Sequence, residues 1–140
     1  MDRTVKNIPN FVDPQVIFNS IYNYLIGEGC KYVDYQGEKV FKKGKGFFSG
    51  PTFIKVSATG NMFQIEGWMK YALLPGVYVG EINLEGFAGS AVRGPVLNRM
   101  NTVEQIIINA NLQAQQQGQY TQQSYAQQPY TQMPNNGYYR

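Results

Sequence analysis

The segment TFIKVSATGNMFQIEGWMKY, residues 52–71, carries the clearest structural signal in the chain. Two runs rich in β-branched and aromatic residues flank Thr59-Gly60-Asn61, which predicts an antiparallel hairpin. Along the second run apolar side chains alternate with polar ones. The apolar side comprises Phe63, Ile65, Met69 and Tyr71, and the polar side comprises Gln64, Glu66 and Lys70. Trp68 falls on the polar side. The alternation predicts a sheet with one buried face and one face in water.

Three further strands are predicted around this hairpin. The runs CKYVDY (30–35) and EKVFKK (38–43) flank Gln36-Gly37, a turn dipeptide that predicts a second hairpin. After the second strand of the first hairpin, Leu74-Pro75-Gly76 turns the chain, and VYVGEINL (77–84) alternates well enough to form a fifth strand.

Two helices flank the strands. Asp13-Pro14 is a good helix start, since Asp caps free N–H groups and Pro suits the first helical position, and Gly27 and Gly29 end that helix. Gly94-Pro95 opens a second helix. Its apolar positions are Val96, Met100, Val103, Ile107 and Ala110, and the capping-box pair of Thr102 with Gln105 predicts a break near Asn101.

The expected fold class is therefore α+β: an N-terminal helix, a four- or five-stranded antiparallel sheet, and a C-terminal helix packed on one sheet face. We expect this compact domain to span residues 1–112. Residues 113–140 contain ten glutamines, five tyrosines and no acidic residue, which is typical of a disordered, low-complexity tail. A five-residue repeat marked by Tyr120, Tyr125 and Tyr130 leaves two interpretations, a solubilising appendage or weak multivalent self-association through tyrosine.

The composition excludes several kinds of chemistry. Histidine is absent and Cys30 is the single cysteine, so the chain has no Cys/His zinc site, no Ser-His-Asp or Cys-His nucleophile and no intrachain disulfide. We expect no cofactor, no metal and no enzymatic activity, with Cys30 packed as a small apolar residue. Glu66, Glu81 and Glu85 are interpreted as solvated surface charges. Without a secretory signal or a run of ~20 apolar residues, a cytoplasmic protein with no membrane span is expected.

Two surfaces are candidate binding sites. Lysines interleaved with aromatic residues suit single-stranded nucleic acid, because the cation meets phosphate and the ring stacks on a base; the candidates are Lys39, Lys42, Lys43, Lys45, Phe47 and Phe48. The competing interpretation places Phe41 in the core and the lysines in water. An apolar lip that docks a protein partner is the second candidate, formed by Leu73, Leu74, Tyr78 and Phe87.

The stretches GEKVFKKGKGFFSGPTFIKV (37–56) and IEGWMKYALLPGVYVGEINLEGFAG (65–89) resemble a small domain of uncharacterised bacterial proteins, some of which carry low-complexity tails. The similarity covers about Phe11 to Leu112. It implies a bacterial, cytosolic α+β protein and brings no assigned activity. The function expected from the sequence is a non-enzymatic interaction module that binds a protein partner, with single-stranded nucleic-acid binding as the alternative.

Overall fold

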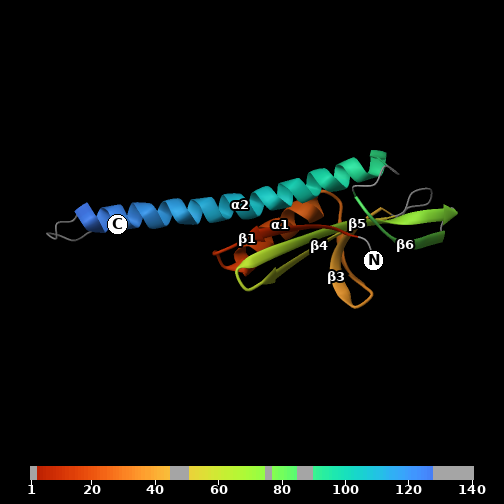
Figure 1. The fold of residues 1–140 in the computed structure, drawn as a ribbon, viewed down its shortest axis with the longest axis horizontal. Helices are drawn as coiled ribbons and strands as arrows, with labels where there is room; N and C mark the ends of the chain where they lie inside the picture. The colour runs from red at the N-terminus through yellow and green to blue at the C-terminus, as the bar shows by residue number, and fades with distance from the viewer. Residues whose placement is uncertain (1–2, 45–50, 75–76, 85–89, 128–140) are drawn as a thin grey trace.

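The computed structural model describes residues 3–44, 51–74, 77–84 and 90–127, with the backbone alone at 71–74, 77–79, 82, 90–93 and 117–127 (Figure 1). The elements in chain order are β1 (Thr4–Pro9), α1 (Pro14–Gly27), β2 (Lys31–Tyr35), β3 (Glu38–Lys43), β4 (Thr52–Thr59), β5 (Met62–Leu74), β6 (Val77–Asn83) and α2 (Ser90–Gln127). The α+β class and the order of helix, antiparallel strands and C-terminal helix agree with the sequence prediction.

The long strand β5 organises the sheet. All pairings are antiparallel, in the order β1-β5-β4-β3-β2, and β6 also pairs with β5. Along the edge of β5 opposite β4, β1 pairs up to Gly67 and β6 pairs from Trp68 onward, so β1 and β6 lie end to end. The backbone N–H of Leu84 donates to the Thr4 hydroxyl at 2.9 Å and joins these two strands.

The strand β1 was not predicted from the sequence. In TVKNIP only Thr4 and Ile8 are buried, and an Asn and a Pro weaken the strand pattern. Pairing with β5 stabilises this segment, and that partner is distant in sequence. Within the described residues the sheet consequently has six strands, where the sequence predicted four or five.

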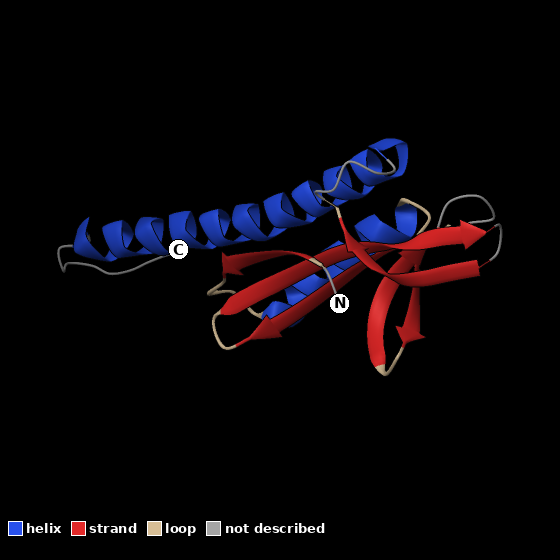
Figure 2. Ribbon diagram, turned by 45° about the vertical axis from the view of Figure 1, so that its right-hand side comes forward, coloured by secondary structure: helices blue, strands red, loops and turns tan. Residues whose placement is uncertain are grey.

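Both helices pack on the same face of the sheet, as Figure 2 shows, and the main core lies between these layers. The buried residues of this core are Ile8, Ile17, Ile21, Leu25, Cys30, Phe41, Ile54, Phe63, Ile65, Met69, Leu84, Val96, Met100, Val103 and Ile107. Phe63, Ile65 and Met69 on β5 thus face the core, as the alternation predicted.

The opposite face of the sheet carries a second, smaller core, so the prediction that this face is wet was wrong. Trp68 is fully buried there together with Val40 and Phe53. Its ring stacks on Phe53 with centroids 5.3 Å apart and an interplanar angle of 10°. Tyr35 packs against the same rings, because the β2–β3 hairpin curls over this face.

Both hairpin turns have the backbone that the sequence predicted. Gln36 and Gly37 have φ values of 51° and 87°, which is typical of a two-residue turn with both central residues left-handed. Between β4 and β5 Gly60 takes a φ of 61°. The first helix begins as predicted, since the Asp13 carboxylate accepts a hydrogen bond from the Gln15 N–H at 3.1 Å and Pro14 is its first residue.

The second helix differs from the prediction at its start and at the expected break. It begins at Ser90, so Pro95 lies in its second turn. No break occurs at Asn101. The Thr102 hydroxyl donates to the Asn98 carbonyl at 3.1 Å inside the helix, instead of capping a new one. Val96, Met100, Val103 and Ile107 form one buried stripe across the expected break, and packing of that stripe on the sheet keeps the helix continuous.

The helix also continues beyond the change in composition at Leu112 and ends at Gln127. In Figure 1 this part of α2 extends past the end of the sheet. Residues 128–140 lie outside the described part of the chain, and disorder of the segment 113–140 stays a prediction.

Gly67 lies where the side chains of Met100 and Leu84 pack closely on β5. A Cβ at this position would lie 2.8 Å from Cδ1 of Leu84 and would collide with Sδ of Met100. We therefore expect Gly67→Ala to lower the free energy of unfolding by about 1–3 kcal/mol through overpacking. Urea unfolding followed by circular dichroism measures the change.

Gly27→Ala is the matched control, because a Cβ at Gly27 meets nothing within 4 Å and the residue is the last of α1. This substitution is expected to raise stability by up to about 1 kcal/mol through helix propensity. If Gly67→Ala is as stable as the unchanged protein, the side chains of Met100 and Leu84 move aside at no cost.

Candidate functional site

The lysines of the nucleic-acid candidate lie on both faces of β3. Phe41 is buried in the main core and Val40 in the smaller one, so the alternation of the strand places Lys39 and Lys43 on the helix side and Lys42 on the opposite side. The three described lysines of the candidate, Lys39, Lys42 and Lys43, therefore do not share one face of the strand. Phe41 in the core matches the competing sequence interpretation.

Two of these lysines have partners within the chain. The ammonium group of Lys43 donates to the Glu28 carbonyl at 2.6 Å, and that of Lys39 lies 3.9 Å from Oδ1 of Asp34. The remaining candidates Lys45, Phe47 and Phe48 lie outside the described residues. Nucleic-acid binding by this hairpin therefore stays a prediction.

The residues of the predicted apolar lip lie in the β5–β6 hairpin. Leu73 and Leu74 are the last residues of β5, and Tyr78 on β6 pairs with Ala72. Only their backbone is described, and Phe87 lies outside the described residues. Of the tail tyrosines, Tyr120 and Tyr125 lie within α2 and Tyr130 lies outside the described chain.

Arg3 is the centre of a charged cluster on the face with the smaller core. Its guanidinium group contacts three carboxylates: Nε lies 2.9 Å from Glu81, Nη1 3.0 Å from Glu66, and Nη2 2.7 Å from Glu38. The Cζ atom of Arg3 also lies 3.6 Å above the centre of the Trp68 ring, within cation–π distance. We call Arg3, Glu38, Glu66 and Glu81 the Arg3 cluster.

The Arg3 cluster connects strands that are not hydrogen-bonded neighbours in the sheet. Glu38 begins β3 and Glu81 belongs to β6, and both bind Arg3 just before β1. The Tyr35 hydroxyl donates to Glu81 at 2.9 Å, and Lys55 lies 2.8 Å from Glu38. The curled β2–β3 hairpin is thereby held against β6, and the second core is closed between them.

The sequence prediction that Glu66 and Glu81 are solvated surface charges was wrong. Their side chains are only 14% and 5% exposed. Alternation correctly placed Glu66 away from the helices. The positive charge that compensates these buried carboxylates is that of Arg3. Arg3 directly precedes β1, a strand that was not predicted. Glu85 lies outside the described residues.

The Arg3 cluster is poorly suited to proton transfer at neutral pH. Hydrogen bonds from Arg3, and then from Lys55, lower the pKa of Glu38 to about 2, and Arg3 lowers the pKa of Glu81 as well. Burial, followed by the hydrogen bond to Glu81, raises the pKa of Tyr35 to about 12. Because an effective general acid or base titrates near the working pH, Glu38 and Glu81 act as fixed charges and Tyr35 as a neutral hydrogen-bond donor, and all three hold the fold.

The lowered carboxylate pKa values predict acid sensitivity. A carboxylate whose pKa is lower in the folded state stabilises the protein above its unfolded pKa, about 4.3 for glutamate. This stabilisation is lost as the pH falls through the folded pKa, about 2 for Glu38. We therefore expect the urea midpoint to fall steeply between about pH 4.5 and 2, and Tyr35 adds a second loss between about pH 10 and 12.

The control for acid sensitivity is Glu38→Gln, which removes one of the titrating carboxylates. Its urea midpoint should depend less on pH over the acid range than that of the unchanged protein, although it starts lower. An unchanged protein whose stability is constant from pH 5 to pH 2.5 would contradict the assignment of the Arg3 cluster as a stabilising ion-pair network.

Cys30 is packed as the sequence predicted. The side chain is buried in the main core, and this burial raises the pKa of its thiol. A thiol that ionises less readily than usual is a weak nucleophile at neutral pH.

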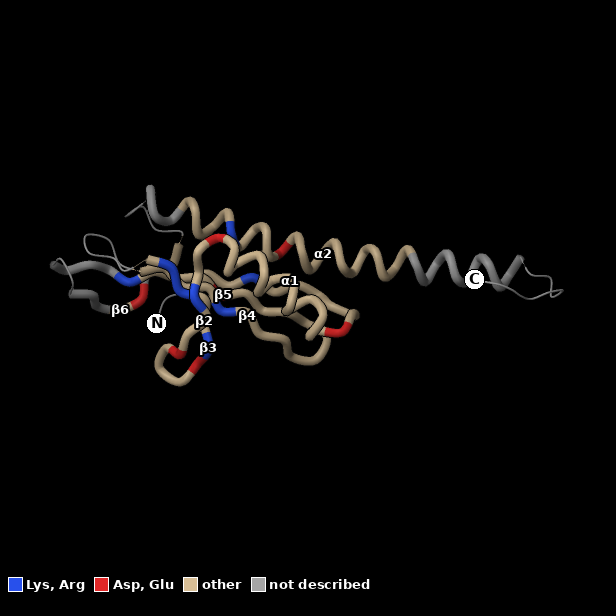
Figure 3. The backbone as a smooth tube through the Cα atoms, turned by 180° about the vertical axis from the view of Figure 1, so that it is seen from behind, with Lys and Arg blue, Asp and Glu red and all other residues tan. Residues whose placement is uncertain are grey.

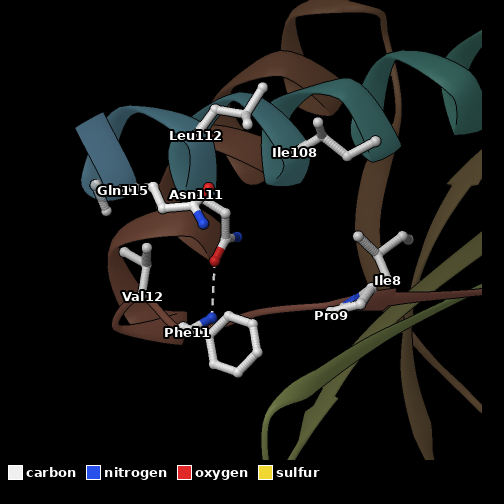
Figure 4. A pocket seen from close by; sticks show the side chains of 9 residues that line it. Ile8, Pro9, Phe11, Val12, Ile108, Asn111, Leu112 and Gln115 are labelled. Carbon is white, nitrogen blue, oxygen red and sulfur yellow. Dashed lines mark hydrogen bonds between the residues drawn. The ribbon is translucent and has the colours of Figure 1, made fainter. Parts of the chain in front are cut away.

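A groove lies between the β1–α1 connection and α2, and Figure 4 shows its lining. The cavity has a volume of about 560 Å³, within the range of ~300–1,000 Å³ found for ligand pockets. We call it the Phe11 groove, and its lining residues are Ile8, Pro9, Phe11, Val12, Ile108, Asn111, Leu112, Ala114 and Gln115. The groove was not predicted from the sequence, because its two walls are about 100 residues apart in the chain.

Hydrogen bonds fix the walls of the Phe11 groove. The Phe11 N–H donates to Oδ1 of Asn111 at 2.7 Å, and Nδ2 of Asn111 donates to Oδ1 of Asn10 at 2.8 Å. Asn10 is itself buried, and its N–H donates to the Asn61 carbonyl at 2.8 Å. The backbone of the connection is therefore held on α2, and the Phe11 side chain is nevertheless 78% exposed.

The Phe11 groove carries no charge. None of its lining residues is ionisable, and the sequence has no charged residue between Glu104 and Arg140. In Figure 3 the coloured charged segments lie on the sheet, at the ends of α1 and on the first part of α2, and the next described part of α2 is tan. The groove thus offers apolar walls and amide groups to a neutral ligand.

Comparison of the chain with known protein families, with curated proteins and with solved structures finds no match. Within the described part of the chain, no three Cys, Asp or Glu side chains are placed to hold a metal ion. Over the same residues, no helix has the length and apolar character needed to cross a membrane.

Proposed function

We propose that the protein is a non-enzymatic interaction module that binds a protein partner through the Phe11 groove. The observation that carries the proposal is an aromatic side chain, 78% exposed, on a backbone that Asn111 and Asn10 hold in place. A fixed backbone reduces the entropy lost on binding, and an aromatic anchor at a cavity is typical of residues that dominate binding energy.

The chemistry of the walls indicates the kind of partner. Leu112 is 49% exposed on the helix side, and no lining residue bears a charge. Burying a charged group in such a groove would remove it from water without an ion partner, which is unfavourable. The partner is therefore expected to present an uncharged segment with aliphatic or aromatic side chains.

Selection from a displayed library of random peptides tests the proposal. We expect enriched peptides to be uncharged, to contain aromatic or aliphatic anchors, and to bind with Kd values of about 1–100 µM. Phe11→Ala should weaken them about tenfold, because truncation of an aromatic anchor costs more than ~1 kcal/mol. Isothermal titration calorimetry with the selected peptides measures both values.

Val16→Ala is the matched control, since Val16 is an apolar residue of α1 that is 58% exposed and does not line the groove. It should leave peptide affinity unchanged. Selected peptides that bind Phe11→Ala and the unchanged protein equally would refute the groove as the site. An oligonucleotide that binds in a strongly salt-dependent way, and is lost in Lys42→Glu, would instead favour nucleic-acid binding.

Bacterial origin, a cytoplasmic location and self-association through the tail tyrosines are part of the same proposal. They are supported by the sequence resemblance, by the use of a single buried cysteine and by the Gln/Tyr repeat.

A further inference from the structure

We infer that Arg99 on α2 and Lys43 at the end of β3 form a binding site for a phosphate group, with the Glu28 carboxylate as an internal competitor. This second site is separate from the Phe11 groove. Arg99 and Asn111 are twelve residues apart in α2, which corresponds to about 18 Å at a rise of ~1.5 Å per residue. Binding at one site and binding at the other are therefore separate measurements.

Arg99 is a buried cation whose hydrogen-bonding capacity is not met by the protein. Its side chain is only 10% exposed, and its buried Nε has no hydrogen-bond partner among the described residues. Nε lies 3.5 Å from Oε1 of Glu28, which is long beside the ~2.7–2.9 Å of a charge-assisted hydrogen bond. Because buried polar groups are nearly always hydrogen-bonded, this Nε points to an acceptor that the chain does not supply.

Arg3 shows how the same fold pairs a buried arginine fully. Its side chain is 8% exposed, and its guanidinium group contacts three carboxylates at 2.7–3.0 Å. At the equally buried Arg99, the contact with a carboxylate is longer than each of these. The fold therefore can bring close acceptors to a buried guanidinium group, and around Arg99 the described residues do not.

Glu28 contacts Arg99 without being fixed by it. Its side chain is 45% exposed and directly follows the last residue of α1, so the carboxylate can rotate into water. Ion pairs in which one partner is this exposed are weak. An oxyanion that offers closer acceptors to Arg99 can therefore take the place of the Glu28 carboxylate.

Lys43 brings a second cation to the same segment of chain. Its Nζ donates to the Glu28 carbonyl at 2.6 Å, and an ammonium group has three N–H donors, so two remain. A Cβ on Gly29 would lie 3.4 Å from this Nζ. Both cations also act on Cys30: burial raises the pKa of its thiol, and the charges of Arg99 and Lys43 oppose that rise. The two cations thus flank the short connection between α1 and β2.

A purely structural role explains these cations less well. Cations near a helix C-terminus stabilise the helix through its dipole. The carbonyl oxygens of residues 24–26 at the end of α1 already accept hydrogen bonds from the N–H groups of residues 28–30. A dipole interaction also works with a solvated side chain, so it does not account for an Arg99 whose Nε is buried and unpaired.

The charge and shape of the site favour phosphate. Once the Glu28 carboxylate turns into water, two positive charges remain, and they match a phosphate group of about −1.5 to −2 at pH 7. A tetrahedral phosphate can accept from the guanidinium fork of Arg99 and from the Lys43 ammonium group at once. A carboxylate carries one negative charge and balances only one of these cations. Free phosphate and a phosphomonoester share the required chemistry.

Titration of the full chain with inorganic phosphate at constant ionic strength tests the site. We expect saturable NMR shifts of the Arg99 Nε–H signal and of the amides of residues 28–30, with a Kd on the order of 1 mM. Glu28→Gln should tighten binding about fivefold, because it removes the competing carboxylate. Arg99→Lys should weaken it about tenfold, because the charge stays and the fork is lost. A structural ion pair predicts no tightening in Glu28→Gln.

Lys39→Gln is the matched control for Lys43→Gln. Both lysines lie on the helix side of β3, but Lys39 is 54% exposed and lies 3.9 Å from Asp34. Lys43→Gln should weaken phosphate binding about tenfold, whereas Lys39→Gln should leave it unchanged. Thermal unfolding midpoints show which variants fold, and the partly exposed Glu28 and Lys43 provide the decisive results if Arg99→Lys does not.

The possible outcomes are distinct. Shifts that do not saturate by about 50 mM phosphate, or equal weakening by Lys43→Gln and Lys39→Gln, would overturn the inference. Acetate that binds as tightly as phosphate would also overturn it, because it indicates a carboxylate site. Tighter binding of phenyl phosphate than of inorganic phosphate would support an esterified ligand, and equal binding would support the free ion. Peptide binding at Phe11 is not affected by any of these results.

Discussion

Arg3→Ala is expected to lower the free energy of unfolding by about 3–5 kcal/mol, the cost typical of removing one partner from a buried ion pair. The substitution leaves Glu38, Glu66 and Glu81 without the guanidinium group that all three contact. Lys55 remains beside Glu38, whereas Glu81, with a side chain that is 5% exposed, keeps the neutral Tyr35 hydroxyl as its hydrogen-bond donor. Urea unfolding at pH 7, followed by circular dichroism, measures the loss.

Lys6→Ala is the matched control because Lys6 is a β1 cation in an exposed ion pair. Its ammonium group lies 3.0 Å from Glu104, and both side chains are 30% exposed. Exposed pairs contribute about 0–1 kcal/mol, so this variant should remain close to the parent. Equal, small losses for Arg3→Ala and Lys6→Ala would show that water penetrates the Arg3 cluster in solution.

Combining Arg3→Ala with Glu66→Gln and Glu81→Gln provides a second check. Removing these charges together with their cation should recover part of the stability lost in Arg3→Ala, because an uncompensated buried charge costs more than a neutral amide. Recovery would assign the loss to electrostatics. A further loss would assign it to packing of the arginine on Trp68.

Trp68→Ala is expected to cost about 3–5 kcal/mol, as for other large aromatic residues removed from a core. The side chain is fully buried, stacks on Phe53 and lies under the Arg3 guanidinium group. Its removal opens a cavity in the smaller core and also deprives Arg3 of the ring beneath it. Because Trp68 is the only tryptophan, unfolding of this variant is followed by circular dichroism instead of fluorescence.

Phe11→Ala is the control for Trp68→Ala, since it removes an aromatic ring that is largely in water. We expect it to change stability by less than about 0.5 kcal/mol, as exposed positions usually do. The effects of Arg3→Ala and Trp68→Ala should not add, because the two residues are in contact. A small loss for Trp68→Ala would mean that the hairpin does not close over this face.

Local patterns in the sequence were sufficient for most of the fold. The alternation around Phe63 and Ile65 identified the face that packs on the helices, and Gly60 and Gly37 marked two real turns. The Asp13-Pro14 start of α1 is equally local, since the cap and the first helical residue are neighbours. These predictions succeed because hydrophobic period and turn conformation depend on residues that are close in the chain.

The same patterns failed where the deciding partner is distant. Thr102 with Gln105 reads as a helix start, yet the stripe that includes Met100 and Val103 packs across it on the sheet. Trp68 alternates with polar residues and was therefore expected in water, but the curled hairpin covers it. Phe11 carries no pattern of its own, and a single exposed aromatic residue before a helix cap gave no reason to expect a groove.

By itself, the sequence determined the α+β class, the hairpin turns, the first helix and the absence of imidazole and of a second thiol. Only the tertiary structure decided the role of Arg3, the burial of Trp68 and the position of the Phe11 groove. The physical reason is the separation of the contacting residues along the chain. Secondary structure is specified within a few residues, whereas these three features depend on contacts between residues about 30–100 positions apart, such as Arg3 with Glu81 and Phe11 with Asn111.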